Sequence, residues 1–113
     1  MIKVYGIKNC DSVKKALKYF DKHNLTYELF DFKQEKVSSE TIVSWLEKTD
    51  LKTLFNARST TYRTLNLKEI NPNDTQKQEW LAKENMLIKR PVVEYGEELL
   101  VGFNEENYNG VFL

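Results

Sequence analysis

The sequence predicts an α/β fold with a mixed four-stranded sheet flanked by helices, and three observations support this. Residues 1–6, 11–23 and 25–32 have the patterns of a strand, an amphipathic helix and a second strand. Residues 91–95 and 99–103 are β-prone segments on either side of Gly96-Glu97-Glu98, which predicts an antiparallel hairpin. Asn104 is suited to cap a final helix. A β-α-β unit followed by a hairpin and a helix is the thioredoxin-like arrangement.

The first helix has a clear buried face. Val13, Ala16, Leu17 and Phe20 recur at the spacing of one helical face. Because a helix connects them, the strands on either side of it are expected to be parallel, with a right-handed crossover.

Residues 37–85 interrupt this pattern with a helical insertion inside a single domain spanning residues 1–113. Ser38 or Ser39 can cap a helix, a short helical piece is expected at 51–55, and 56–63 is expected to be loop plus one helical turn. Asn73 and Gln76 match a capping box that opens a helix to about Glu84. The expected apolar side of the insertion's first helix consists of Ile42, Val43, Trp45 and Leu46, and Trp80 is also assigned to the core.

The composition narrows the function classes. The chain of 113 residues has 17 basic and 17 acidic residues, so no excess charge points to direct binding of nucleic acid or of an anionic membrane. It contains no long apolar run and no signal-peptide pattern. A single cysteine cannot form an internal disulfide, so we expect a reducing, cytoplasmic setting. Zero net charge and a small fold are compatible with a monomer.

Cys10 is the strongest candidate for chemistry. It lies between the first strand and the first helix, where free backbone N–H groups and the helix dipole favour an anion. The thiolate is the nucleophilic form of cysteine. From position alone, a reactive thiol and a buried structural cysteine remain equal alternatives. His23 has no partners at metal-ligand spacing, so no metal site is expected.

Several residues are candidates for binding a ligand near this thiol. Asn9 can donate a hydrogen bond or turn the chain. Arg90, before the strand-opening Pro91, can hold a carboxylate or oxyanion with two hydrogen bonds. Arg58 is a second candidate for anion binding, with Ser59 beside it in the same loop.

Three segments resemble the ArsC/Spx family of bacterial thioredoxin-like proteins: residues 5–16 with the Asn-Cys-Asp sequence, residues 89–93 with Arg-Pro, and residues 100–104. The chain is most similar to the single-cysteine, YffB-like branch of glutathione-dependent thiol reductases. The resemblance implies a cis Pro91 beside the active-site sulfur and places the Arg58–Ser59 loop over the site. It also implies that Cys10 is the nucleophile of a thiol–disulfide oxidoreductase, with glutathione as co-substrate and no bound cofactor.

Two alternatives follow from other branches of the family. A regulator like Spx would bind the alpha subunit of RNA polymerase, but Spx-type proteins usually have a second cysteine where this chain has Val13. An arsenate reductase would use Cys10 and Arg90, but its other two arginines correspond to Asn56 and to Gly102-Phe103. We therefore expect thiol reduction first, regulation second and arsenate reduction third.

Overall fold

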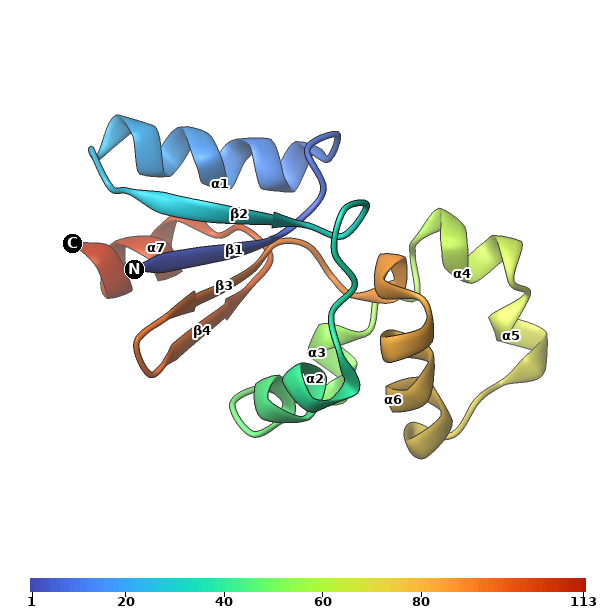
Figure 1. Cartoon of the computed structure of the whole chain (residues 1–113). Helices are drawn as coiled ribbons and strands as arrows, with labels where there is room; N and C mark the ends of the chain where they lie inside the picture. The colour runs from blue at the N-terminus through green and yellow to red at the C-terminus, as the bar shows by residue number, and fades with distance from the viewer. The chain divides into compact units, whose positions relative to one another are not determined.

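The computed structural model describes residues 1–113. Strands from the N-terminal and C-terminal parts of the chain form one four-stranded sheet (Figure 1). Its strands are β1 (Ile2–Gly6), β2 (Tyr27–Asp31), β3 (Val92–Tyr95) and β4 (Glu98–Val101), in the order β2-β1-β3-β4. β1 and β2 are parallel, whereas β3 pairs antiparallel with both β1 and β4. The predicted β-α-β unit and hairpin are therefore confirmed, and the fold is thioredoxin-like.

The chain divides into two compact units. The sheet unit consists of residues 1–35 and 90–113, and the helical unit consists of residues 36–89. The predicted insertion, 37–85, lies within the helical unit. That the whole chain acts as one domain stays a prediction.

Helices α1 (Asp11–Lys22) and α7 (Glu105–Phe112) cover one face of the sheet. Ala16, Tyr19 and Phe20 of α1 and Tyr108 of α7 form a buried cluster with strand residues Ile2, Val4 and Val93. Val13, Ala16 and Phe20 are buried as predicted, and Leu17 packs against the cluster. The Asn104 side chain caps α7 by accepting the backbone N–H of Asn107.

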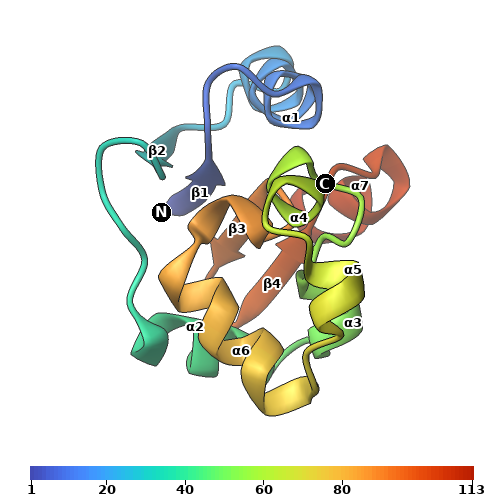
Figure 2. The same ribbon diagram turned by 90° about the vertical axis from the view of Figure 1, so that its right-hand side faces the viewer.

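The helical unit consists of short helices: α2 (Ser39–Leu46), α3 (Leu51–Leu54), α4 (Thr60–Thr64), α5 (Leu67–Ile70), α6 (Asp74–Lys83) and the 3-10 turn η1 (Asn85–Leu87). α2 packs against α6 (Figure 2). Ser38 caps α2, and the predicted capping box of Asn73 and Gln76 opens α6.

Some details differ from the sequence prediction. Val43 is 44% exposed, because the two turns of α2 bury only Ile42 and Trp45. Trp80 is only half-buried, with Lys83 Nζ 4.9 Å from its ring centroid. α5 and η1 were not predicted, since neither is long enough to show a helical period. No helix is long and apolar enough to cross a bilayer.

Candidate functional site

Cys10 is the N-cap residue of α1. Its backbone is extended, with φ −143° and ψ 126°, and its carbonyl accepts the N–H of Lys14 at 2.9 Å. Its side chain makes no capping hydrogen bond, and the residue is half-buried. The thiol therefore stands beside the unpaired N–H groups of a 12-residue helix without serving as their cap.

Gly6, the last residue of β1, brings three parts of the sheet unit close together. A Cβ atom at position 6 would lie 2.7 Å from Val13 Cγ2 and 3.8 Å from Arg90 Cβ. The absence of a side chain at Gly6 thus lets the first turns of α1 and the start of β3 approach the end of β1. Figure 1 shows the β1–α1 loop and the start of β3 at the same end of the sheet.

The Arg90–Pro91 peptide bond is cis, as the family resemblance implies. Pro91 is buried and its carbonyl accepts the N–H of Gly102 at 2.7 Å, next to the β3–β4 ladder. Arg90 is half-buried. The segment that carries its guanidinium is therefore anchored to the sheet on its C-terminal side, through Pro91 and β3.

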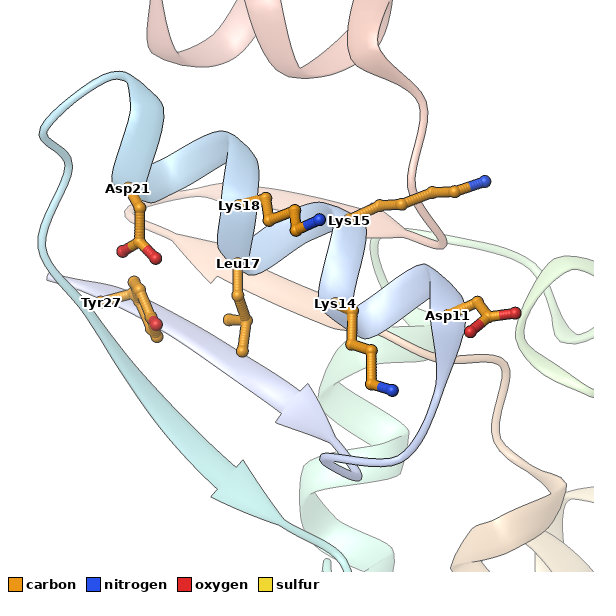
Figure 3. Close-up of a pocket in the computed structure, with 7 residues that line it drawn as sticks. All are labelled: Asp11, Lys14, Lys15, Leu17, Lys18, Asp21 and Tyr27. Atoms are coloured by element: carbon orange, nitrogen blue, oxygen red, sulfur yellow. The ribbon is translucent and has the colours of Figure 1, made fainter.

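The surface next to Cys10 carries mixed charges. Asn9 and Lys8 are exposed in the β1–α1 loop, and Asp11 begins the helix. A surface hollow of about 480 Å³ lies along α1. Figure 3 shows the residues that line it: Leu17 and Tyr27 supply apolar surface, and Asp11, Lys14, Lys15, Lys18 and Asp21 supply charge. This alternation of signs does not select strongly for either a cation or an anion.

Tyr5 makes a polar contact on the face of the sheet that α1 and α7 do not cover. Its ring stacks on Phe30 at 4.9 Å, and its hydroxyl donates to Glu94 Oε1 at 3.0 Å. Burial raises the pKa of the Tyr5 hydroxyl, and the negative charge of Glu94 raises it further. The hydroxyl therefore keeps its proton and acts as a hydrogen-bond donor.

Arg58 and Ser59 lie in the helical unit, in the loop before α4. The Asn56 side chain accepts the N–H of Arg58 at 3.1 Å, which forms a tight turn. Ser59 is 7% exposed, and its hydroxyl accepts the N–H of Tyr62 at 3.1 Å as the N-cap of α4. Ser59 thus has a structural role that the sequence analysis did not assign, and its role in ligand binding stays a prediction.

Arg63, in α4, is a cationic residue beside Arg58 that is not among the site residues expected from the sequence. Its Nη1 donates to the carbonyl of Arg58 at 3.2 Å, so the two arginines are neighbours. The sequence gives no signal for this contact, because residues five apart do not share a helical face. No group of three or more His, Cys, Asp or Glu side chains is arranged to hold a metal ion.

Comparisons with known proteins agree with this geometry. The model of the ArsC family matches residues 5–111. An uncharacterized protein of Haemophilus influenzae is 40% identical over 113 residues, covering 99% of both chains. The global transcriptional regulator Spx of Listeria innocua is 28% identical, covering 94% of this chain and 82% of Spx.

Solved structures of similar proteins also match nearly the whole chain. The structure of a protein named YFFB superposes with a TM-score of 0.92, with 31% identity and full coverage of both chains. An arsenate reductase related protein from Brucella melitensis has a TM-score of 0.75 and 33% identity, covering 98% of this chain and 93% of that one. The matched residues include both the Cys10 segment and the Arg90-Pro91 segment, and the chain belongs to the ArsC family.

Proposed function

We propose that this protein is a cytoplasmic, glutathione-dependent thiol–disulfide oxidoreductase with Cys10 as its single nucleophile. One observation carries the proposal: the only thiol of the chain lies at the N-terminus of α1, half-buried and not used as the helix cap. A helix N-terminus favours the thiolate, which is the form that attacks a disulfide.

The proposed reaction needs an external thiol, because the chain has no second cysteine. The Cys10 thiolate attacks a disulfide R–S–S–R′, forms Cys10–S–S–R and releases R′–S⁻, which takes up a proton. A glutathione thiolate then attacks the Cys10 sulfur, releases R–S⁻ and leaves a Cys10–glutathione disulfide. A second glutathione regenerates the Cys10 thiolate and leaves as oxidised glutathione. In total, one substrate disulfide is reduced and two glutathione thiols are oxidised.

Arg90 is the proposed partner for a carboxylate of glutathione. It lies in the sheet unit, close to Gly6 at the end of the strand that leads to Cys10. A guanidinium binds a carboxylate with two parallel hydrogen bonds. Asn9 and the cis Pro91 complete the proposed site in this unit. Ligand binding by Arg58 and Ser59 of the helical unit stays a prediction from the family resemblance.

A comparison of two disulfides tests the role of Arg90. The rate at which Cys10 forms a mixed disulfide is measured by intact mass, with oxidised glutathione and with uncharged 2-hydroxyethyl disulfide. Arg90→Gln should slow the reaction with oxidised glutathione by about tenfold, because a charge-assisted hydrogen bond is lost. The reaction with hydroxyethyl disulfide should keep its rate. Equal slowing with both disulfides would contradict the proposal that Arg90 binds a carboxylate of glutathione.

The second candidate is a transcriptional regulator that binds the alpha subunit of RNA polymerase, which the similarity to Spx favours. The position of the second Spx cysteine is Val13 here, and it is fully buried against Gly6. A pull-down with the C-terminal domain of the alpha subunit tests this function. Stoichiometric capture would favour the regulator, and absence of capture would leave the oxidoreductase.

Arsenate reduction is the weakest candidate. Gly102 has a positive φ of 80°, a region that disfavours an arginine, and the ring of Phe103 packs against Tyr108 at 4.9 Å. Both positions corresponding to the third family arginine are thus committed to other roles.

A further inference from the structure

The helical unit contains a positively charged pocket that the proposed thiol chemistry does not explain. It is a hollow of about 610 Å³ lined by Ala57, Arg58, Tyr62, Arg63, Asn66 and Lys68. Three of the six lining residues are cationic and none is acidic. All of them come from one stretch of 12 residues, so the pocket is formed within the helical unit alone.

Hydrogen bonds hold the backbone around this pocket in place. Arg63 Nη1 donates to the Arg58 carbonyl at 3.2 Å, and Asn56 Oδ1 accepts the N–H of Arg58 at 3.1 Å. The buried Ser59 caps α4. The two arginines are therefore held near each other by the loop itself, before any ligand is present.

Tyr62 supplies a fixed aromatic wall. Its ring meets that of the buried Phe55 edge to face, with the centroids 6.0 Å apart. Tyr62 is half-buried, whereas Arg58, Arg63 and Lys68 are exposed. The pocket thus combines an anchored aromatic wall with exposed cationic side chains around its edge.

One carboxylate adjoins the pocket. Glu69 Oε2 accepts a hydrogen bond from Asn66 Nδ2 at 3.1 Å, and this bond orients the Asn66 amide. Counting Glu69 with the three cations still leaves two net positive charges over residues 57–69. A chain with zero net charge therefore concentrates positive charge at this place.

We propose that this pocket binds a small molecule with at least two oxyanion groups, held by Arg58, Arg63 and Lys68. Arginine forms paired hydrogen bonds with carboxylate and phosphate oxygens alike, and lysine contributes a point charge. The shared chemistry is a compact polyanion, in which the oxyanions are either phosphoryl groups or carboxylates. The binding needs neither a thiol nor a disulfide in the ligand, so it goes beyond the proposed oxidoreductase function.

The test is a titration of the full-length chain, carrying Cys10→Ser, with inorganic pyrophosphate and separately with citrate at constant ionic strength. Backbone amide shifts are followed by NMR. We expect saturable shifts confined to residues 56–69. A larger affinity for pyrophosphate would identify a phosphoryl ligand, and a larger affinity for citrate a carboxylate ligand. Absence of saturable shifts with both at millimolar concentration would overturn the proposal.

Charge-removing variants locate the site. Arg63→Gln and Lys68→Gln should each weaken binding by about tenfold. Lys48→Gln removes the same charge from an exposed turn of the same unit and should leave the affinity unchanged. Lys68→Gln keeps the test valid if Arg63→Gln disturbs the loop. Equal weakening by Lys48→Gln and Lys68→Gln would mean unspecific attraction and would contradict the proposal.

The result is independent of the thiol chemistry. The titration uses a chain without Cys10, so failure to bind a polyanion leaves the mixed-disulfide measurements unaffected. Conversely, absence of any glutathione effect would leave the pocket of residues 57–68 to be judged by its own titration.

Discussion

The sheet unit and the helical unit differ in the contacts that supplement their apolar cores. In the sheet unit, strands far apart in the sequence pair with one another over a cluster of aromatic rings. In the helical unit, side chains of Ser38, Asp50, Ser59 and Asn73 cap four short helices, and Asn85 is one of two buried polar side chains. Both units bury apolar side chains, among them Trp45, Leu54 and Leu81 in the helical unit. What differs is that the sheet unit joins distant segments by strand pairing and aromatic contacts, whereas the helical unit adds helix caps and the buried amide of Asn85.

The difference fits the chemistry assigned to each unit. Cys10 is the N-cap of α1, which packs on the sheet, and Arg90 lies two residues before β3, so both are held by rigid elements. Arg58 lies in the loop before α4 and Arg63 lies in α4, and hydrogen bonds connect them at the surface of the helical unit. Both arginine side chains are exposed, so they can meet an anion from solution.

Removal of the Phe20 ring is expected to have the largest effect. Phe20 is fully buried, with its ring centroid 5.2 Å from Phe112 and 5.8 Å from Tyr108. Phe20→Ala should lower the free energy of unfolding by about 3–5 kcal/mol through lost burial and a cavity. Urea unfolding followed by circular dichroism measures the loss, and Phe20→Leu should lose less. A cost equal to that of a surface substitution would contradict the importance of aromatic packing.

Asn85 is the corresponding residue of the helical unit. Its Oδ1 accepts the N–H of Val37 at 2.7 Å and its Nδ2 donates to the Leu81 carbonyl at 2.8 Å. Asn85→Ala leaves both groups buried without these partners and should cost about 2–4 kcal/mol. Tryptophan fluorescence reports on this unit, because Trp45 and Trp80 both lie in it. The exposed Asn107→Ala should stay within about 0.5 kcal/mol.

Gly6 tests the close approach next to the proposed site. Gly6→Ala places a methyl group 2.7 Å from Val13 Cγ2, and Val13 is fully buried. The clash should cost about 1–3 kcal/mol. Gly110→Ala is the matched control, because no atom lies within 4 Å of its added Cβ. If both variants are equally stable, the approach of α1 to β1 is looser than described.

Variants of Ser59 test whether this residue caps α4 or binds a ligand. Ser59→Ala removes the cap of α4 and should cost about 0.5–2 kcal/mol, measured by urea unfolding. Ser59→Asp retains a cap acceptor and should restore most of the stability. A variant that is fully stable yet reacts more slowly with oxidised glutathione would instead assign Ser59 to the ligand.

Tyr108 is expected to have the smallest effect at neutral pH and a distinct effect at alkaline pH. Its hydroxyl donates to the Gly102 carbonyl at 2.9 Å, so Tyr108→Phe should cost about 0.5–1.5 kcal/mol.

Burial raises the pKa of Tyr108 in the folded protein. The resulting stability is present below the unfolded pKa of about 10 and is lost as the pH rises toward the folded value. Urea midpoints measured from neutral to strongly alkaline pH should therefore fall less steeply for Tyr108→Phe than for the unchanged chain. Parallel curves would show that this hydroxyl does not contribute to the pH dependence.

The sequence predicted well those features that depend on residues close together in the chain. The buried face of α1 and the capping box of α6 each depend on residues within one or two helical turns. Tyr19 was missed as a core residue, because its hydroxyl finds its partner, Asn109, 90 positions away. α5 was missed because it spans four residues between Asn66 and Asn71, both at positive φ.

In the candidate site, too, the sequence predicted the residues with a local signal and missed the contacts without one. Cys10 was found from its place between a strand and a helix, and Arg90 from the proline that follows it. The capping role of Ser59 and the pairing of Arg63 with Arg58 depend on the geometry of a loop without a period. Such contacts become visible only once the backbone is known.

The most direct test of the proposed function compares the reaction of Cys10 in the folded chain with that in the urea-unfolded chain. Intact mass follows the formation of the Cys10–glutathione disulfide with oxidised glutathione at one pH. Correction for urea uses the same reaction of a short cysteine peptide. A site that favours the thiolate and binds glutathione predicts a rate at least about tenfold higher in the folded chain. An equal or lower rate in the folded chain would contradict the assignment of Cys10 as the nucleophile.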